Sequence, residues 1–291
     1  DWPAASTIGA ILERNELVEP REVSRKTPPH EQPLAEADAP NRIWSADFKG
    51  QFELGDGTMC YPLTITDNYS RMILGCKALP STKGGPVAEY FETVFERWGL
   101  PEAIRTDNGV PFGSRAPRGL TQLSASWLAR GIEHERIEPG QPQQNGRHER
   151  MHLTLKEDTA RPAAESMEAQ QKVFDSFRRF FNELRPHESL QQTTPAATHE
   201  PSGRQVQEDA DELEYPHCDL SRRVRTNGKI LLGGGSVYIT NCLTGYVVGV
   251  TEVDVGVWVV SFAGRDLGYF EPDDDSISAM RDQGAGKRSR L

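Results

Sequence analysis

The sequence predicts an α/β domain, in which helices flank a mixed sheet, followed by a small all-β barrel domain. Two observations predict this arrangement. As far as residue 184, segments with the two-residue alternation of strands interchange with segments that carry the 3.6-residue repeat of amphipathic helices. Beyond residue 215, short β-rich segments are separated by glycine turns, a spacing typical of small barrels.

Three strands open the α/β domain. They are expected at residues 43–48, 60–67 and 72–78. In the first strand, alternation places Trp44, Ala46 and Phe48 on one face and Asp47 on the other. The Gly-Asp-Gly sequence at 55–57 indicates a hairpin turn, so the three strands should form an antiparallel meander.

Helices and strands alternate in the rest of this domain. An apolar stripe predicts a helix at residues 87–98, which Gly99 and Pro101 end. The further elements are a strand at 103–106, a helix at 120–130, a strand at 132–136, and helices at 146–160 and 167–184. The resulting order, βββαβαβα, is that of the ribonuclease H fold, so a ribonuclease H-like mixed sheet is expected.

Changes in composition divide the chain into segments. We expect the last helix of a truncated module at 1–20, a linker at 21–40, the α/β domain at 41–204, an acidic linker at 205–215, the barrel at 216–275 and a tail at 276–291. Strands of the barrel are expected at 229–232, 237–240, 246–253, 257–262 and 266–270. The opening residue, Asp1, suggests a chain cut from a longer protein.

Composition limits the classes of function. The net charge of −10 and pI near 5.3 argue against nucleic-acid binding over the whole surface. Basic residues nevertheless cluster at Arg222, Arg223, Arg225 and Lys229, so an acidic average can hide a basic face. No apolar run reaches the roughly 20 residues of a membrane helix. Four cysteines without a C-x-x-C pair predict reduced thiols in a cytoplasmic protein and no zinc site.

Three carboxylates occupy unusual local settings. Asp47 lies inside an apolar strand, Asp107 ends another strand before a turn, and Glu149 lies in the first turns of a helix. Each also has an ordinary interpretation: a solvated strand face, a common Asp-Asn-Gly turn, and an acid that stabilises the helix dipole. Three carboxylates that a fold brings together from separate elements can instead hold two divalent ions for phosphoryl transfer.

The motifs around these acids resemble the catalytic core of retroviral integrases and of bacterial insertion-sequence transposases. The motifs are Trp44-Ser45-Ala46-Asp47-Phe48, Thr106-Asp107-Asn108-Gly109 and the segment from Pro139 to His152. The resemblance covers about residues 41–200, and the segment at 1–20 resembles the end of the helix-turn-helix module that these transposases carry first. Phe181-Asn182-x-x-Arg185-Pro186-His187 resembles the transposase branch specifically, and nothing matches the zinc module of the retroviral proteins.

This resemblance implies that Asp47, Asp107 and Glu149 are the catalytic, metal-binding triad. It implies two Mg²⁺ or Mn²⁺ ions per active site, with Asp47 between them, and an enzyme that cleaves DNA and transfers the strand of an insertion element. The implied partners are transposon-end and target DNA and further copies of the chain, in the bacterial cytoplasm with the nucleoid. The 41 residues between Asp107 and Glu149 exceed the interval common in the family, and we place the surplus in the loop at 113–120.

Six residues are candidate DNA contacts: Lys156, His152, Asn145, Gln143, Arg223 and Arg225. Glu149, His152 and Lys156 share one helix face, which would bring Lys156 to a phosphate beside the metals. The ordinary alternative for Lys156 is a solvated lysine.

Two other functions remain open. A metal-dependent nuclease of the same fold would share the three acids without joining strands. A domesticated, catalytically silent DNA-binding protein would not require Asp47, Asp107 and Glu149 to occur together.

Overall fold

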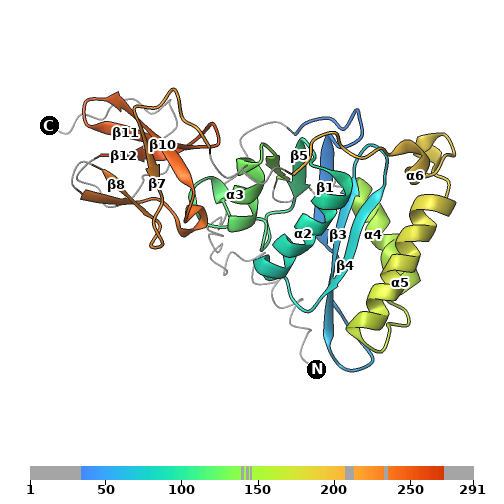
Figure 1. Ribbon diagram of the computed structural model, residues 1–291. Coiled ribbons are helices and arrows are strands. Elements are labelled where there is room, and N and C mark those ends of the chain that lie inside the picture. Colours follow the sequence, from blue (N-terminus) through green and yellow to red (C-terminus); the bar gives the residue numbers. More distant parts are fainter. Residues whose placement is uncertain are drawn as a thin grey trace, which may run out of the picture.

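The computed structural model describes residues 34–138, 141, 144, 146–206, 213–232 and 235–271. They form an α/β domain and an all-β module, which lie side by side in Figure 1. The predicted helix-turn-helix remnant and carboxy-terminal tail lie outside the described residues, as do most of the linker at 21–40 and the central part of the acidic linker.

The sheet of the α/β domain has the predicted topology. Its strands are β1 (Ile43–Phe48), β2 (Phe52–Glu53), β3 (Met59–Asp67), β4 (Ile73–Leu79), β5 (Ala103–Thr106) and β6 (Glu133–Arg136). β1, β3 and β4 form the antiparallel meander, whereas β5 and β6 run parallel to β1. The order β4-β3-β1-β5-β6, with the short β2 paired to the start of β3, is the order of a ribonuclease H-like sheet.

Helices cover both faces of this sheet. They are α2 (Gly84–Trp98), α3 (Gln122–Ala129), α4 (Gly146–Thr159) and α5 (Met167–Arg179). One apolar core joins the strands to α2 and α3 and contains Trp44 and Ala46, as the alternation in the first strand predicts. A second core joins the opposite face to α4 and α5, where Phe174 and Phe177 are buried. Asp47 therefore lies on the face that α4 and α5 cover.

The helix predicted at 167–184 ends earlier than expected. α5 stops at Arg179, and Phe180–Leu184 forms a single π-helical turn. Within that turn, the side chain of Asn182 accepts a bond from the backbone N–H of Ile73 and donates to its C=O, both at 2.9 Å. We attribute the wider turn to this pair of bonds, which ties the end of the helix to β4.

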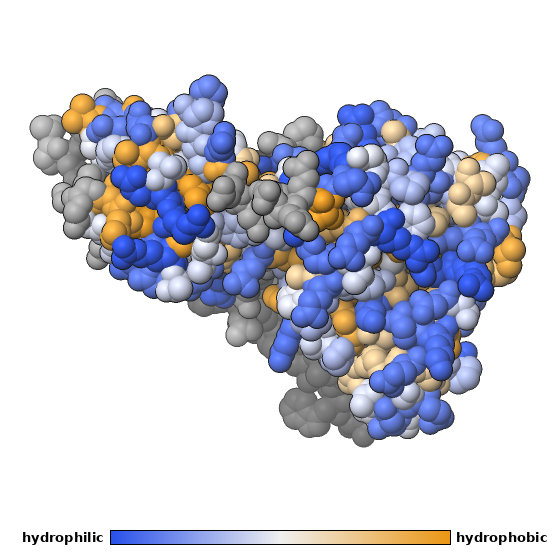
Figure 2. All heavy atoms as spheres, in the orientation of Figure 1, coloured by the Kyte–Doolittle hydropathy of each residue, from blue (hydrophilic) through white to orange (hydrophobic). Residues whose placement is uncertain are grey.

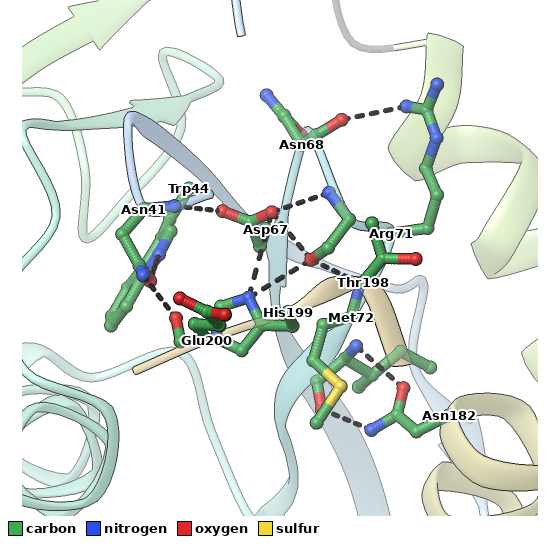
Figure 3. Close-up of polar contacts among 12 residues, drawn as sticks. Asn41, Trp44, Asp67, Asn68, Arg71, Met72, Asn182, Thr198, His199 and Glu200 are labelled. Carbon is green, nitrogen blue, oxygen red and sulfur yellow. Dashed lines mark hydrogen bonds and ion pairs between the residues drawn. The ribbon is translucent and has the colours of Figure 1, made fainter. Parts of the chain in front are cut away.

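A second polar cluster fastens the end of β3 to the chain before β1 and after α6 (Pro195–Thr198), as Figure 3 shows. The buried carboxylate of Asp67 accepts hydrogen bonds from Asn41 N–H and from the N–H and hydroxyl of Ser70, each at 2.7 Å. His199 Nδ1 lies 3.1 Å from the Ser70 hydroxyl. Asn41 also donates to the carbonyl of Glu200. These bonds fix the ends of the α/β domain beside its sheet.

The predicted all-β module is confirmed. Its strands are β7 (Leu220–Arg223), β8 (Lys229–Leu232), β9 (Gly235–Tyr238), β10 (Val247–Asp254), β11 (Val257–Phe262) and β12 (Arg265–Phe270). A four-stranded sheet, β12-β11-β10-β7, and the hairpin β8-β9 enclose one apolar core. The strand expected at 237–240 is shifted to 235–238, because the Thr240 side chain caps a 3₁₀ turn that begins at Asn241.

The core of the all-β module extends into the α/β domain. Leu120 and three residues of α3, Ala125, Leu128 and Ala129, belong to the same apolar cluster as the module's strands. The predicted surplus loop at 113–120 also contacts the module, since the guanidinium of Arg118 donates to the carbonyl of Asp266. α3 thus packs against the sheet on one side and against the module on the other.

The surface in Figure 2 is largely hydrophilic over the α/β domain, with hydrophobic residues gathered on the all-β module. Exposed apolar side chains of the module include Leu231, Tyr238, Val253 and Val255. Among the described helices, none has the length and apolar character that crossing a membrane requires.

Candidate active site

Asp47 lies near the carboxy-terminal end of β1, between two neighbouring strands. Thr64 of β3 is its antiparallel partner. On the other side, β1 and β5 pair in parallel with Ser45 opposite Arg105, and Asp47 and Asp107 each lie two residues further along the chain from this pair. Facing positions on neighbouring strands are about 5 Å apart. The pairing of β1 with β5 therefore brings the first two acids of the predicted triad together.

Asp107 follows the last residue of β5 and begins a turn. Its carboxylate accepts a hydrogen bond from the backbone N–H of Gly109 at 3.0 Å, and Asn108 donates from its side chain to the carbonyl of Ile137. Burial raises the pKa of Asp107 above its ordinary value, and the bond from Gly109 acts in the opposite direction. The Asp-Asn-Gly turn thus holds a partly desolvated carboxylate beside β1.

Glu149 lies in the first turn of α4, where it is exposed. Its charge reaches Asp47, whose pKa is raised from 3.8 to about 7. Burial is the largest cause of that increase, the Asp107 charge is the next that acts in the same direction, and Glu149 adds a smaller effect. The Phe48 N–H and the Lys49 charge oppose it. Asp107 and Glu149 therefore both act electrostatically on Asp47, but among the described residues neither belongs to the group of possible metal-ligand atoms that lie within 4.8 Å of one another around Asp47. Carboxylate oxygens are the donors that fit a hard divalent cation.

Two histidines of α4 lie beneath this group of acids. Thr64 Oγ1 lies 2.7 Å from Nε2 of His148 and 2.6 Å from Nε2 of His152. Thr66 Oγ1 lies 2.8 Å from Nδ1 of His148. His152 Nδ1 lies 3.7 Å from Oδ2 of Asp47. Asp47, His148 and His152 thus each place a possible ligand atom within 4.8 Å of the other two.

Both imidazoles are neutral in this setting. Burial lowers the pKa of His148 to about 3. Burial, with smaller effects from His148 and Lys49, lowers the pKa of His152 to about 2. A neutral imidazole carries one N–H donor and one nitrogen lone pair. It binds a metal ion through the nitrogen that has the lone pair.

The candidate DNA contacts fall in different places. Lys156 is exposed on α4, one turn beyond His152. The His152 side chain is only 4% exposed, so this conformation places it beside Asp47 and not on the surface expected for a DNA contact. Gln143 and Asn145 lie outside the described residues.

In the all-β module, Arg223 and Arg225 are both exposed, whereas Arg222 is partly buried and donates to the carbonyl of Leu231. Arg222 therefore differs from Arg223 and Arg225 in burial. β7 ends at Arg223, and the buried Val224 separates the two exposed arginines.

Several residues of the site were missed in the sequence. Thr64 and Thr66 read as ordinary alternating strand residues, and His148 as a helix residue without a partner. Lys49 follows the first strand and affects the charge balance of both Asp47 and His152. The spacing of Thr64 and Thr66 on one strand face was an available signal, but it identifies no partner helix.

Two models described as integrase core domain match the chain, one over residues 37–142 and the other over residues 130–195. The chain is 31% identical over 191 residues to an uncharacterized 39.2 kDa protein of insertion element IS476 from Xanthomonas euvesicatoria, covering 65% of this chain and 53% of that protein. It is 29% identical over 164 residues to an uncharacterized 31.7 kDa protein of insertion element IS407 from Burkholderia multivorans, covering 56% and 57%.

The chain spans little more than half the length of these two relatives. Among solved structures, it is similar to a chain of a simian T-cell lymphotropic virus intasome bound to the PP2A regulatory subunit B56 gamma. The identity is 16% and the TM-score 0.48, and the match covers 93% of this chain and 96% of that chain.

Proposed function

We propose that the chain is a transposase of an insertion element with an integrase core domain, and that it cleaves DNA at the element's ends and joins them to target DNA. One observation carries the proposal. The carboxylates of Asp107 and Glu149 both act on Asp47, although the three residues lie after β5, in α4 and in β1. Holding the partly desolvated carboxylates of Asp47 and Asp107 side by side is costly unless cations neutralise them, and phosphoryl transfer uses such cations.

We assign the metal ligands to Asp47, Asp107 and Glu149. When bound, two divalent ions, Mg²⁺ or Mn²⁺, would activate a water or a DNA 3′-hydroxyl and neutralise the charge of the leaving oxygen. The residues themselves hold the site in place: Asp47 and Asp107 through the paired strands β1 and β5, and Glu149 through α4. Because β1 and β5 are part of the central sheet, these two carboxylates are fixed before DNA binds.

DNA and further copies of the chain are the proposed partners. Lys156 extends from the exposed side of α4 and would neutralise a phosphate near the acids. Arg223 and Arg225 provide a second positive surface on the all-β module. If Lys156 and the two arginines bind the same DNA duplex, that duplex lies along both the α/β domain and the all-β module. We place this activity in the bacterial cytoplasm, where the DNA substrates lie.

Cleavage and joining with defined DNA ends test the proposal. The substrate is the inverted-repeat DNA that flanks the gene, supplied both intact and with a free 3′-hydroxyl already exposed. The protein should cleave the intact end and join the exposed end to target DNA in Mg²⁺ or Mn²⁺, and EDTA should stop both reactions. Asp47→Asn and Glu149→Gln remove a ligand and little volume, so each should abolish both reactions and leave DNA binding largely intact.

The alternatives give different results in the same assay. Cleavage without joining would indicate a nuclease. Tight DNA binding without either reaction would indicate a silent binding protein. Full activity of both substituted proteins would overturn the assignment of the acids.

A further inference from the structure

The hydrogen atoms of the buried cluster beneath Asp47 can be assigned by counting donors. The Thr64 hydroxyl has one hydrogen and three neighbours: the backbone carbonyl of Asp47 at 3.2 Å, and Nε2 of both histidines. The carbonyl can only accept. If all three contacts are hydrogen bonds, Thr64 donates to the carbonyl and accepts an N–H from each imidazole.

This assignment fixes both histidines. His148 carries its hydrogen on Nε2, so its Nδ1 accepts from the hydroxyl of Thr66 at 2.8 Å. Both nitrogens of His148 are then engaged. His152 also carries its hydrogen on Nε2, and its Nδ1 presents a lone pair 3.7 Å from Oδ2 of Asp47.

A lone pair and a carboxylate that face each other at this distance repel one another, and a cation bound between them would remove the repulsion. The separation exceeds the roughly 3.2 Å limit of a good hydrogen bond. It is within reach of one shared ion, because two ligands that each lie about 2.1 Å from a metal cannot be more than about 4.2 Å apart.

We propose that His152 provides a nitrogen ligand, through Nδ1, to the divalent ion that Asp47 binds. The inference rests on the proposed function, since it concerns the same ion. His148 is a positioning residue together with Thr64 and Thr66, because its own nitrogens are both used in hydrogen bonds. The site therefore combines carboxylate oxygens with one imidazole, a donor set that accepts Mn²⁺ or Co²⁺ more readily than oxygen donors alone.

The tautomer is tested first, without metal. In the full chain labelled with ¹⁵N-histidine and kept in EDTA, NMR should show His152 protonated on Nε2 and not on Nδ1. A hydrogen on Nδ1 would make His152 a hydrogen-bond donor to Asp47 and would overturn the proposal.

Metal ligation is then measured directly. Pulsed electron paramagnetic resonance of Mn²⁺ bound to the same labelled protein should detect coupling to a histidine nitrogen. His152→Asn should remove this coupling, and His217→Asn, a substitution of an exposed histidine in the all-β module, should retain it. Coupling that persists in His152→Asn would overturn the proposal.

Asp47→Asn separates this inference from the proposed function. If Mn²⁺ binding depends on Asp47 but shows no nitrogen coupling, the histidine ligand is wrong and the acidic site stands. If Mn²⁺ binding does not depend on Asp47, both are wrong.

The positioning role has its own test. Thr64→Val removes the hydroxyl that orients His152 and should weaken Mn²⁺ binding about tenfold or more, the usual scale for a residue that orients a metal ligand through a hydrogen bond. Thr64→Ser keeps a hydroxyl and should restore most of the affinity and the nitrogen coupling. Equal losses in the two variants would indicate a packing role for Thr64 and would overturn the proposed positioning.

Discussion

Without metal, the cluster of acids should destabilise the fold at neutral and alkaline pH, and Asp47→Asn should relieve this. The pKa of Asp47 in the folded protein, about 7, lies above its ordinary value of 3.8, so the folded state holds the proton more tightly than the unfolded chain does. The stability that this more tightly held proton contributes is fully present below pH 3.8 and is lost as the pH rises through about 7. Asparagine carries no charge, so the variant escapes the loss.

The pKa values set the size of the effect. The difference between 3.8 and about 7 corresponds to about 4 kcal/mol, at about 1.4 kcal/mol for each pH unit. Because the Asp47 side chain is 24% exposed, solvent screens part of this energy. We expect Asp47→Asn to raise the free energy of unfolding by about 2–4 kcal/mol at pH 8 and by less than half as much at pH 5.

Urea unfolding in EDTA at pH 5 and pH 8 measures both values. Asp158→Asn, which neutralises an exposed acid of α4, is the control and should change stability little at either pH. Adding Mg²⁺ should stabilise the unsubstituted protein and not Asp47→Asn, because only the former retains the ligand. Equal or lower stability of Asp47→Asn at pH 8, or a gain that does not vary with pH, would refute the reasoning.

Three further predictions concern other parts of the chain. Asn182→Ala leaves the N–H and C=O of a buried strand residue without their partners and should cost about 2–4 kcal/mol in urea unfolding, whereas the exposed neighbour Glu183→Ala should cost less than about 0.5 kcal/mol. Lys156→Ala should weaken DNA binding in a filter or anisotropy assay and slow chemistry without abolishing it; unchanged affinity would make it a solvated lysine. Joint substitution of Arg223 and Arg225 by alanine should flatten the slope of log affinity against log salt by about 2 for all sequences alike, and an unchanged slope with lower stability would indicate a structural role.

Local patterns were sufficient for the strands and for the helix that contains Glu149. The two-residue alternation of β1 predicts which residues enter the core, and β1, β5 and α4 have close to their predicted bounds. These features depend on neighbours within one or two turns of the chain. The choice of Asp47, Asp107 and Glu149 as the catalytic acids came from the family resemblance, and the parallel pairing of β1 with β5 was implied by the fold and not by any local pattern.

Contacts between distant residues could not be predicted in the same way. Thr64 and His148 are 84 positions apart, and Ile73 and Asn182 are 109 apart. The first contact belongs to the hydrogen-bond network from which we assign the tautomers of His148 and His152, and the second ties the π turn after α5 to β4. Helical periodicity predicts one shared face for Glu149, His152 and Lys156, but His152 is buried whereas Glu149 and Lys156 are exposed, and periodicity contains no information on burial depth.

α3 belongs to two apolar cores. The boundary that composition marks at residues 205–215 therefore does not separate two parts that are stable on their own. A protein cut there would expose Leu120, Ala125, Leu128 and Ala129 to water and should aggregate or lose stability. The isolated all-β module would lose the packing of its core against these four residues. We expect the two parts to unfold in one transition, and any exchange of this module between related proteins to require matching changes in α3.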